Sequence, residues 1–246
     1  MRALFCSAVA LAFWTPARAD DPNLAMAVID AAIKAHGGLE NLAKTQGMKR
    51  TAAGTISFFG QEVAFTDEMI VKLPERWRWT FEGGPQGQKT RFVVVYNGGK
   101  AWQSAAGGVT EVTKDRLREI GDEVYRLWIV TLAPLKTEKG FSLIALADSK
   151  VNGRDASCVL VSRQGQSDLK LFFDRATGLL VKIERKTKEA GIPTEKAYFY
   201  SGHTDVDGVK LPSKYIEESN GKKVVDVSTI SYQLLPRADD SLFEKP

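Results

Sequence analysis

The stretch that decides the fold is Lys72-Leu73-Pro74-Glu75-Arg76-Trp77-Arg78-Trp79-Thr80-Phe81. Aromatic and polar residues alternate there with a period of two, and a β-strand turns successive side chains to opposite faces with that same period. Trp77, Trp79 and Phe81 therefore share one face of a predicted strand, and Arg78 lies on the opposite, wetter face. Three large rings on one strand cover more apolar area than a thin sheet needs. They indicate either a thick core or the wall of an apolar cavity, and both interpretations stay open.

The N-terminal segment, residues 1–19, has the pattern of a cleaved signal peptide. It starts with a positive charge at Arg2, continues with an apolar run too short to span a bilayer, and ends in Ala17-Arg18-Ala19, which fits the small-x-small cleavage rule. We therefore expect cleavage after Ala19 and export of the mature chain. Loss of the two arginines of the leader lowers the formal net charge from +4 to +2.

The composition of the mature chain excludes several classes of protein. Cys158 is left alone once Cys6 departs with the leader, and it lies in an apolar run, so we expect a buried thiol and no internal disulfide. Basic and acidic residues are interspersed, which speaks against nucleic-acid binding. No second apolar stretch could span a bilayer, so the mature protein is expected to be soluble. Without repeats or linkers, residues 20–246 are expected to form a single domain and a monomer.

The pattern along the chain predicts a mostly β, α+β protein. An amphipathic helix is expected over residues 24–36, ended by Gly37-Gly38, and a short helix over 39–44. Asn97-Gly98 is a strong two-residue hairpin signal. The rest reads as a meander of roughly ten to twelve antiparallel strands of ordinary length. The candidate strands are residues 51–59, 61–72, 75–82, 89–96, 100–104, 141–149, 150–163, 168–174, 179–188, 195–203, 210–218 and 222–232.

One amphipathic helix interrupts these strands at residues 114–132. Thr113 can cap its start and Pro134 is expected to stop it. Its apolar residues recur at helical spacing, so they form one face, and that face must cover a face of the sheet.

The search for chemistry finds no catalytic constellation. His203, Asp205 and Asp207 could share a strand face as metal ligands, but the same residues also read as an ordinary turn, and further ligands are lacking. There is no nucleophile elbow, phosphate loop or zinc-protease helix. We therefore expect no metal, no cofactor and no enzymatic activity.

Four segments resemble the periplasmic outer-membrane lipoprotein carriers and lipoprotein-sorting proteins of the LolA-like superfamily. Members have a stretch of the form Arg-Pro-x-x-Phe-x-Trp, a hairpin reading roughly Asp-Gly-Lys-x-Leu-Trp, and an Asp-x-x-Thr-Gly-Leu turn. The corresponding segments are Leu73-Pro74-Glu75-Arg76-Trp77-Arg78-Trp79, Tyr96-Asn97-Gly98-Gly99-Lys100-Ala101-Trp102, Phe172-Phe173-Asp174-Arg175-Ala176-Thr177-Gly178-Leu179-Leu180 and Ser241-Leu242-Phe243-Glu244-Lys245-Pro246.

The resemblance implies a single strongly curved antiparallel sheet, a half-barrel, whose concave face is covered by the N-terminal and mid-chain helices. It implies a periplasmic protein that holds the acyl chains of a lipid or lipoprotein in an apolar interior and exchanges them with a membrane-bound donor or acceptor. The sequence departs from the family at Leu73, where the carriers have an arginine that takes part in closing the lid.

The apolar residues of the strands and of the mid-chain helix are the candidate ligand-binding residues. One expected cavity wall consists of Phe65, Met69, Trp77, Trp79, Phe81, Val94 and Tyr96, and the expected lid of Leu117, Ile120, Val124, Leu127 and Trp128. The alternative is that these side chains fill a solid core, because a core contacts many residues and a small ligand few. The alternative function is an envelope stress sensor or protein-interaction module that uses the same fold without lipid transport.

Overall fold

The computed structural model describes residues 22–246 except residues 59, 86–89 and 106; the predicted signal peptide and its cleavage site lie outside the described residues. The helices are α1 (Pro22–Ala35), α2 (Leu39–Lys44), α3 (Lys114–Ile129), α4 (Pro134–Thr137) and a 3-10 helix (Asp240–Phe243). The strands are β1 (Gly47–Phe58), β2 (Gln61–Lys72), β3 (Arg76–Gly83), β4 (Thr90–Asn97), β5 (Lys100–Ala105), β6 (Gly108–Glu111), β7 (Phe141–Val151), β8 (Arg154–Arg163), β9 (Leu169–Asp174), β10 (Leu180–Glu189), β11 (Ile192–Ser201), β12 (Thr204–Val206), β13 (Val209–Leu211), β14 (Lys214–Ser219) and β15 (Lys222–Leu234).

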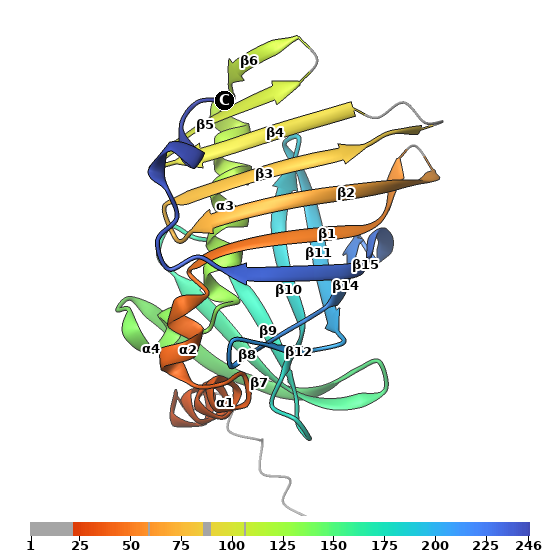
Figure 1. Cartoon of the computed structure of the whole chain (residues 1–246). Helices are drawn as coiled ribbons and strands as arrows, with labels where there is room; N and C mark the ends of the chain where they lie inside the picture. Colours follow the sequence, from red (N-terminus) through yellow and green to blue (C-terminus); the bar gives the residue numbers. More distant parts are fainter. Residues whose placement is uncertain (1–21, 59, 86–89, 106) are drawn as a thin grey trace, which may run out of the picture.

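Thirteen of these strands form one curved antiparallel sheet, in the order β6-β5-β4-β3-β2-β1-β15-β14-β11-β10-β9-β8-β7. The sheet is not closed, because β6 and β7 are its two edges, and β12 and β13 pair only with each other. The N-terminal meander and the C-terminal strands join where β1 pairs with β15. Figure 1 shows the sheet bending so that β10 and β11 lie behind β1, β2 and β3. The predicted fold class is confirmed, with more strands than expected.

The helices lie against the sheet at two places. α1 packs against β7 and β8, and α3 packs against β10 and β5. Figure 1 shows α3 crossing behind β1–β5, between the two arms of the bent sheet. The apolar face of α3, including Ile120 and Val124, is buried in the main core. α3 therefore covers part of the concave face.

Local signals are confirmed with small shifts in position. The Thr113 hydroxyl accepts a hydrogen bond from the Arg116 N–H and caps α3. The predicted hairpin after β4 forms, but its two loop residues are Gly98 and Gly99, one position later, with φ values of +55° and +85°. The sequence predicted that Pro134 stops α3, and this was wrong: α3 ends earlier, at Ile129, and Pro134 begins α4.

The face of β3 that carries Arg78 is not the wet face that the alternation predicted. The C-terminal segment crosses it, and Phe243, which has no exposed surface, packs there with Ile70 and Val95. The Arg78 Nη1 donates a hydrogen bond of 3.1 Å to the Leu242 carbonyl oxygen. That expectation was wrong because a segment more than 150 residues downstream supplies the cover.

Cys158 is buried as a free thiol, as the sequence predicts. Burial raises the pKa of this thiol to about 11, so the thiolate is disfavoured at neutral pH.

Candidate functional site

The concave face of β2 and β3 carries a continuous row of aromatic rings. The Trp77 and Trp79 ring centroids lie 6.2 Å apart with planes inclined by only 9°. Phe81 lies 5.6 Å from Trp79 and 5.4 Å from the Phe65 ring. Trp77 and Phe65 are buried, whereas Trp79 and Phe81 are half-buried. Part of the row is therefore accessible rather than packed under other side chains.

Gly83 leaves room for these rings. It lies opposite Phe65 in the β2–β3 register. A Cβ at this position would come within 2.9 Å of the Phe65 Cβ and within 2.9 Å of the Phe81 Cζ. Any larger residue would push the two rings apart, so glycine is what allows them to stack at this end of the row.

A buried ion pair lies within the aromatic row. Asp67 points to the same face as Phe65 and Met69, and its carboxylate accepts hydrogen bonds of 2.8 and 2.6 Å from the Arg50 Nη2. The Trp79 Nε1 donates a third bond of 3.1 Å to the same carboxylate. Burial acts to lower the pKa of Arg50, but the charge and hydrogen bonds of Asp67, together with Tyr215 and Tyr232, raise it. Arg50 is therefore fixed as a cation beside the rings.

The opposite wall is a second charged cluster, formed by α3 with β10 and β11. The Glu123 carboxylate accepts bonds from the Arg126 Nε at 3.1 Å and from the Arg185 Nη2 at 2.6 Å. Arg126 also donates to the Tyr200 hydroxyl, and Arg185 to the Tyr198 hydroxyl, both at 2.9 Å. Burial would raise the pKa of Glu123, but the two guanidinium groups lower it to about 2. Glu123 is thus ionised at any pH near neutrality.

Between these two walls runs a groove of about 430 Å³. Its aromatic side comes from β2 and β3, its charged side from α3, β10, β11 and β14, and residues near the β1–β2, β10–β11 and β14–β15 turns line its outer part. Two contacts hold these turns together: the Lys223 Nζ lies 3.6 Å from a Glu62 carboxylate oxygen, and Ser219 bonds to Glu189 at 3.3 Å. The groove is therefore an amphipathic channel rather than a uniformly apolar one.

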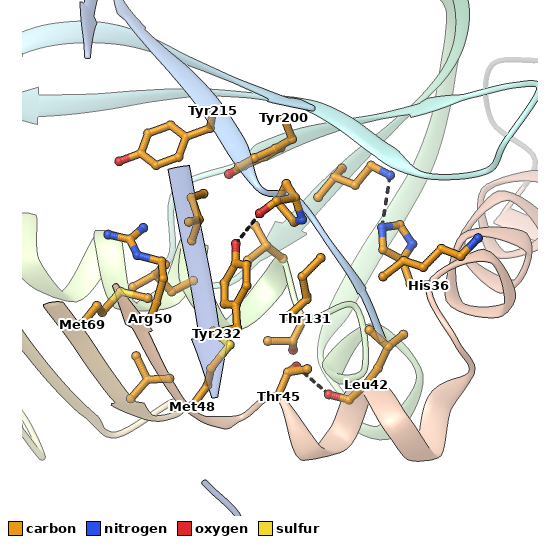
Figure 2. A pocket seen from close by; sticks show the side chains of 18 of the residues that line it. His36, Leu42, Thr45, Met48, Arg50, Met69, Thr131, Tyr200, Tyr215 and Tyr232 are labelled. Atoms are coloured by element: carbon orange, nitrogen blue, oxygen red, sulfur yellow. Dashed lines mark hydrogen bonds between the residues drawn. The ribbon is translucent and has the colours of Figure 1, made fainter. Parts of the chain in front are cut away.

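A smaller cavity of about 100 Å³ lies further inside (Figure 2). Arg50, Met69, Arg126, Tyr198 and Tyr215 line both spaces, so they mark the junction between the groove and the inner cavity. The volume is below the roughly 150 Å³ of a cavity that holds benzene. Without rearrangement, the inner cavity can accept only a fragment of an alkyl chain.

Seven of the twelve predicted site residues line the groove. They are Phe65, Met69, Trp77, Trp79, Phe81, Ile120 and Leu127. The structure places the other five in or against the main core, away from the described lining of both spaces: Val94, Tyr96, Leu117, Val124 and Trp128. The cavity wall and the solid core are therefore not exclusive, because four of the seven groove residues, Met69, Trp77, Ile120 and Leu127, also belong to the main core. Ligand contact by the other five residues stays a prediction.

The charged members of the site were missed from sequence. Arg50 and Arg185 gave no local signal, and Asp67 stood out only as an interruption of an apolar face. The pairing of Glu123 with Arg185 joins residues 62 positions apart, which no periodic pattern predicts. The spacing of Glu123 and Arg126, three residues apart on α3, was the other available hint.

His203, Asp205 and Asp207 form no metal site. Asp205 accepts a bond from the Gly208 N–H at 3.0 Å in the β12–β13 turn, which is the alternative that the sequence left open. Within the described residues, no three His, Cys, Asp or Glu side chains gather as metal ligands. Leu73, at the family's lid-arginine position, is buried and lines the inner cavity. In the part of the chain that the structure covers, no helix is long and apolar enough to cross a membrane.

Comparison with solved structures identifies the fold. A LolA superfamily protein from Nitrosomonas europaea superposes with a TM-score of 0.58 at 12% identity, covering 90% of this chain and 97% of that one. A Desulfovibrio piger protein of the DUF1329 family gives 0.57 at 14% identity, with 91% and 98% covered. A Vibrio parahaemolyticus domain, provisionally assigned as outer membrane lipoprotein-sorting, gives 0.54 at 12% identity, with 89% and 97% covered.

This chain therefore has the LolA-like fold. No family model matches its sequence, and no curated protein does so either. At these identities, the likeness concerns the fold alone.

Proposed function

We propose that this protein is a periplasmic lipid or lipoprotein carrier that shelters an acyl chain in the groove beneath α3. The observation that supports this most directly is a groove of about 430 Å³ bordered by half-buried aromatic rings. Half-buried rings on a concave face lose contact with water when an alkyl chain covers them, and that loss favours binding. Burial contributes about 0.8 kcal/mol per methylene, so even half of a long acyl chain gains several kcal/mol in such a groove.

The proposal includes the rest of the sequence-based expectations. Residues 1–19 are a signal peptide cleaved after Ala19, and residues 20–246 are one monomeric domain in the periplasm. The protein carries no cofactor and catalyses no reaction, and a membrane-bound donor or acceptor exchanges the lipid with it. Ile192, which is 65% exposed at the β10–β11 turn, is an apolar side chain that such a partner could contact.

Two measurements test the carrier function. Native mass spectrometry of protein purified from cells is expected to show a bound fatty acid or phospholipid, and delipidated protein should take up an acyl probe. Phe81→Asp places a charge on the aromatic row and should weaken uptake roughly tenfold or more, because the carboxylate must lose water when the chain binds.

The matched control is Phe58→Asp, the same change at a half-exposed ring outside the groove lining; it should retain uptake. Thermal unfolding of both variants verifies that they fold. Wild-type protein that is bare as isolated and stays bare after incubation with lipid refutes the carrier function.

A further inference from the structure

The junction between the groove and the inner cavity carries an uncompensated positive charge. Three buried guanidinium groups, those of Arg50, Arg126 and Arg185, face only two carboxylates, Asp67 and Glu123. The same surplus of one holds over the whole lining of the groove, where six basic residues meet five acidic ones. Lys196 does not add to the surplus, because its ammonium lies 2.6 Å from two carboxylates, those of Glu217 and Glu189, and both acids are already included in the count of five.

The excess of positive charge is larger in the lining of the inner cavity. Arg50, Arg126 and Lys210 line it, and no acidic residue does so among the described residues. The inner cavity is also lined by Tyr198, Tyr200 and Tyr215, whose hydroxyl groups can donate hydrogen bonds to an anion. Figure 2 shows Arg50 and Tyr215 on one side of the cavity, and the Arg50 guanidinium carbon lies 5.9 Å from the Tyr215 ring centroid.

Two of the guanidinium groups have donors to spare. Arg50 binds Asp67 through Nη2 alone, and its buried Nε–H has no acceptor in the described part of the chain. The buried Nε–H of Arg185 likewise has none. Arg126 uses Nε and Nη2 on Glu123 and Nη1 on a tyrosine hydroxyl. Buried donors without acceptors are rare in folded proteins, and each needs a physical reason.

A buried surplus charge also has a cost in free energy. Taking a cation out of water is unfavourable unless an anion or an acceptor compensates for it. Arginine prefers planar anions, because its donors form a rigid fork that fits two carboxylate oxygens. The junction is therefore an incomplete ion cluster that lacks one negative charge.

We propose that the ligand of the groove is an amphiphile with a singly charged carboxylate headgroup, of the long-chain fatty acid class. Its carboxylate binds at the junction among Arg50, Arg126 and Arg185, where the surplus charge and the unpaired Nε–H donors of Arg50 and Arg185 lie. Its alkyl chain runs along the aromatic row formed by Trp79, Phe81 and Phe65, toward the outer end of the groove. This inference rests on the proposed carrier function and adds the chemical class of the cargo. One carboxylate would neutralise the surplus positive charge and accept hydrogen bonds from the unpaired N–H donors. A neutral lipid would leave the charge uncompensated.

The test compares laurate with dodecan-1-ol, two probes with the same chain length and different headgroups, by titration calorimetry on delipidated protein. Wild-type protein should bind laurate roughly tenfold to a hundredfold more tightly than the alcohol, as expected for hydrogen bonds to a charged group. Arg126→Gln removes the surplus charge and leaves Glu123 paired with Arg185. It should remove most of the preference for laurate without changing the affinity for the alcohol, and Arg126→Lys should restore part of it.

Arg118→Gln is the matched control, because Arg118 makes the same kind of ion pair on the exposed side of α3 and lines neither space; its preference should equal that of the wild type. If wild-type protein binds both probes equally, the headgroup site is refuted while the carrier function stands. If it binds neither, the carrier function itself fails. The ratio of the wild-type affinities for laurate and dodecan-1-ol tests the headgroup site even if an Arg126 variant does not fold.

Discussion

His36 should make the stability of this protein fall in mild acid. The ring is buried where α1 ends, and its Nδ1 donates a hydrogen bond of 2.8 Å to the Ala32 carbonyl oxygen. Its Nε2 accepts a bond of 3.3 Å from the Leu180 N–H. The two partners together require the neutral tautomer with the proton on Nδ1. A second proton on Nε2 would point at the Leu180 N–H and break that bond.

The size of the effect follows from the pKa. Burial lowers the pKa of His36 from its ordinary value of 6.5 to about 4, and the neighbouring His203 and Lys210 act in the same direction. Below pH 6.5 the unfolded chain takes up a proton that the folded chain refuses, so the free energy of unfolding falls as the pH drops from 6.5 toward 4. At about 1.36 kcal/mol per pH unit, the total loss is on the order of 3 kcal/mol.

Urea unfolding followed by tryptophan fluorescence between pH 7.5 and 4 measures this loss. His36→Gln keeps an acceptor for Leu180 but has no proton to bind, so its stability should depend less on pH over this interval than that of the wild type. His203→Gln is the matched control, because it removes the neighbouring ring, 6.0 Å away, and leaves His36 in place. Burial also lowers the pKa of His203, so this variant should lose only the part of the slope that comes from His203 and keep the part that comes from His36. A His36→Gln protein with the full wild-type slope would refute the reasoning.

Two further substitutions test the cover that the C-terminal segment provides. Phe243→Ala should lower the free energy of unfolding by about 3–5 kcal/mol, because it empties a fully buried site. Phe58→Ala, at a half-exposed ring, should lower it far less. Equal losses in the two variants would contradict the packing of Phe243 against β3. Arg78→Met should cost about 1–2 kcal/mol through the lost bond to Leu242. Arg118→Met, at an exposed ion pair, should stay within about 0.5 kcal/mol in the same urea titration, and an Arg78→Met protein as stable as this control would show that face to be wet after all.

The large elements were predictable because their signals are local. The two-residue alternation of Trp77, Trp79 and Phe81 and the Thr113 cap each depend on a few consecutive residues, and the structure has both features where they were expected. β12 and β13 were not found as strands of their own, because three residues are too few to show a period. Element ends were also displaced by a few residues, as at the start of β1.

The charged half of the site was beyond sequence reasoning for a different reason. Arg50 meets Asp67 because β1 pairs with β2 in one particular register, and a slip of one residue would turn Arg50 to the other face. Glu123 meets Arg185 only because the sheet curves around α3. Such contacts are consequences of the whole fold, so residue patterns predicted the apolar wall and missed the polar one.

The amphipathic character of the groove bears on how a carrier would work. A carrier has to release its cargo, and a fully enclosed apolar cavity would hold a long chain very tightly at about 0.8 kcal/mol per methylene. The inner cavity of about 100 Å³ is too small for such a chain, so the chain would lie in the open groove beside the charged wall. There the chain covers rings on one side and meets Glu123, Arg126 and Arg185 on the other, so each methylene gains less than it would in a dry cavity. Under the proposed function, a groove with one aromatic and one ionic wall favours moderate affinity for the chain, and the headgroup supplies the selectivity.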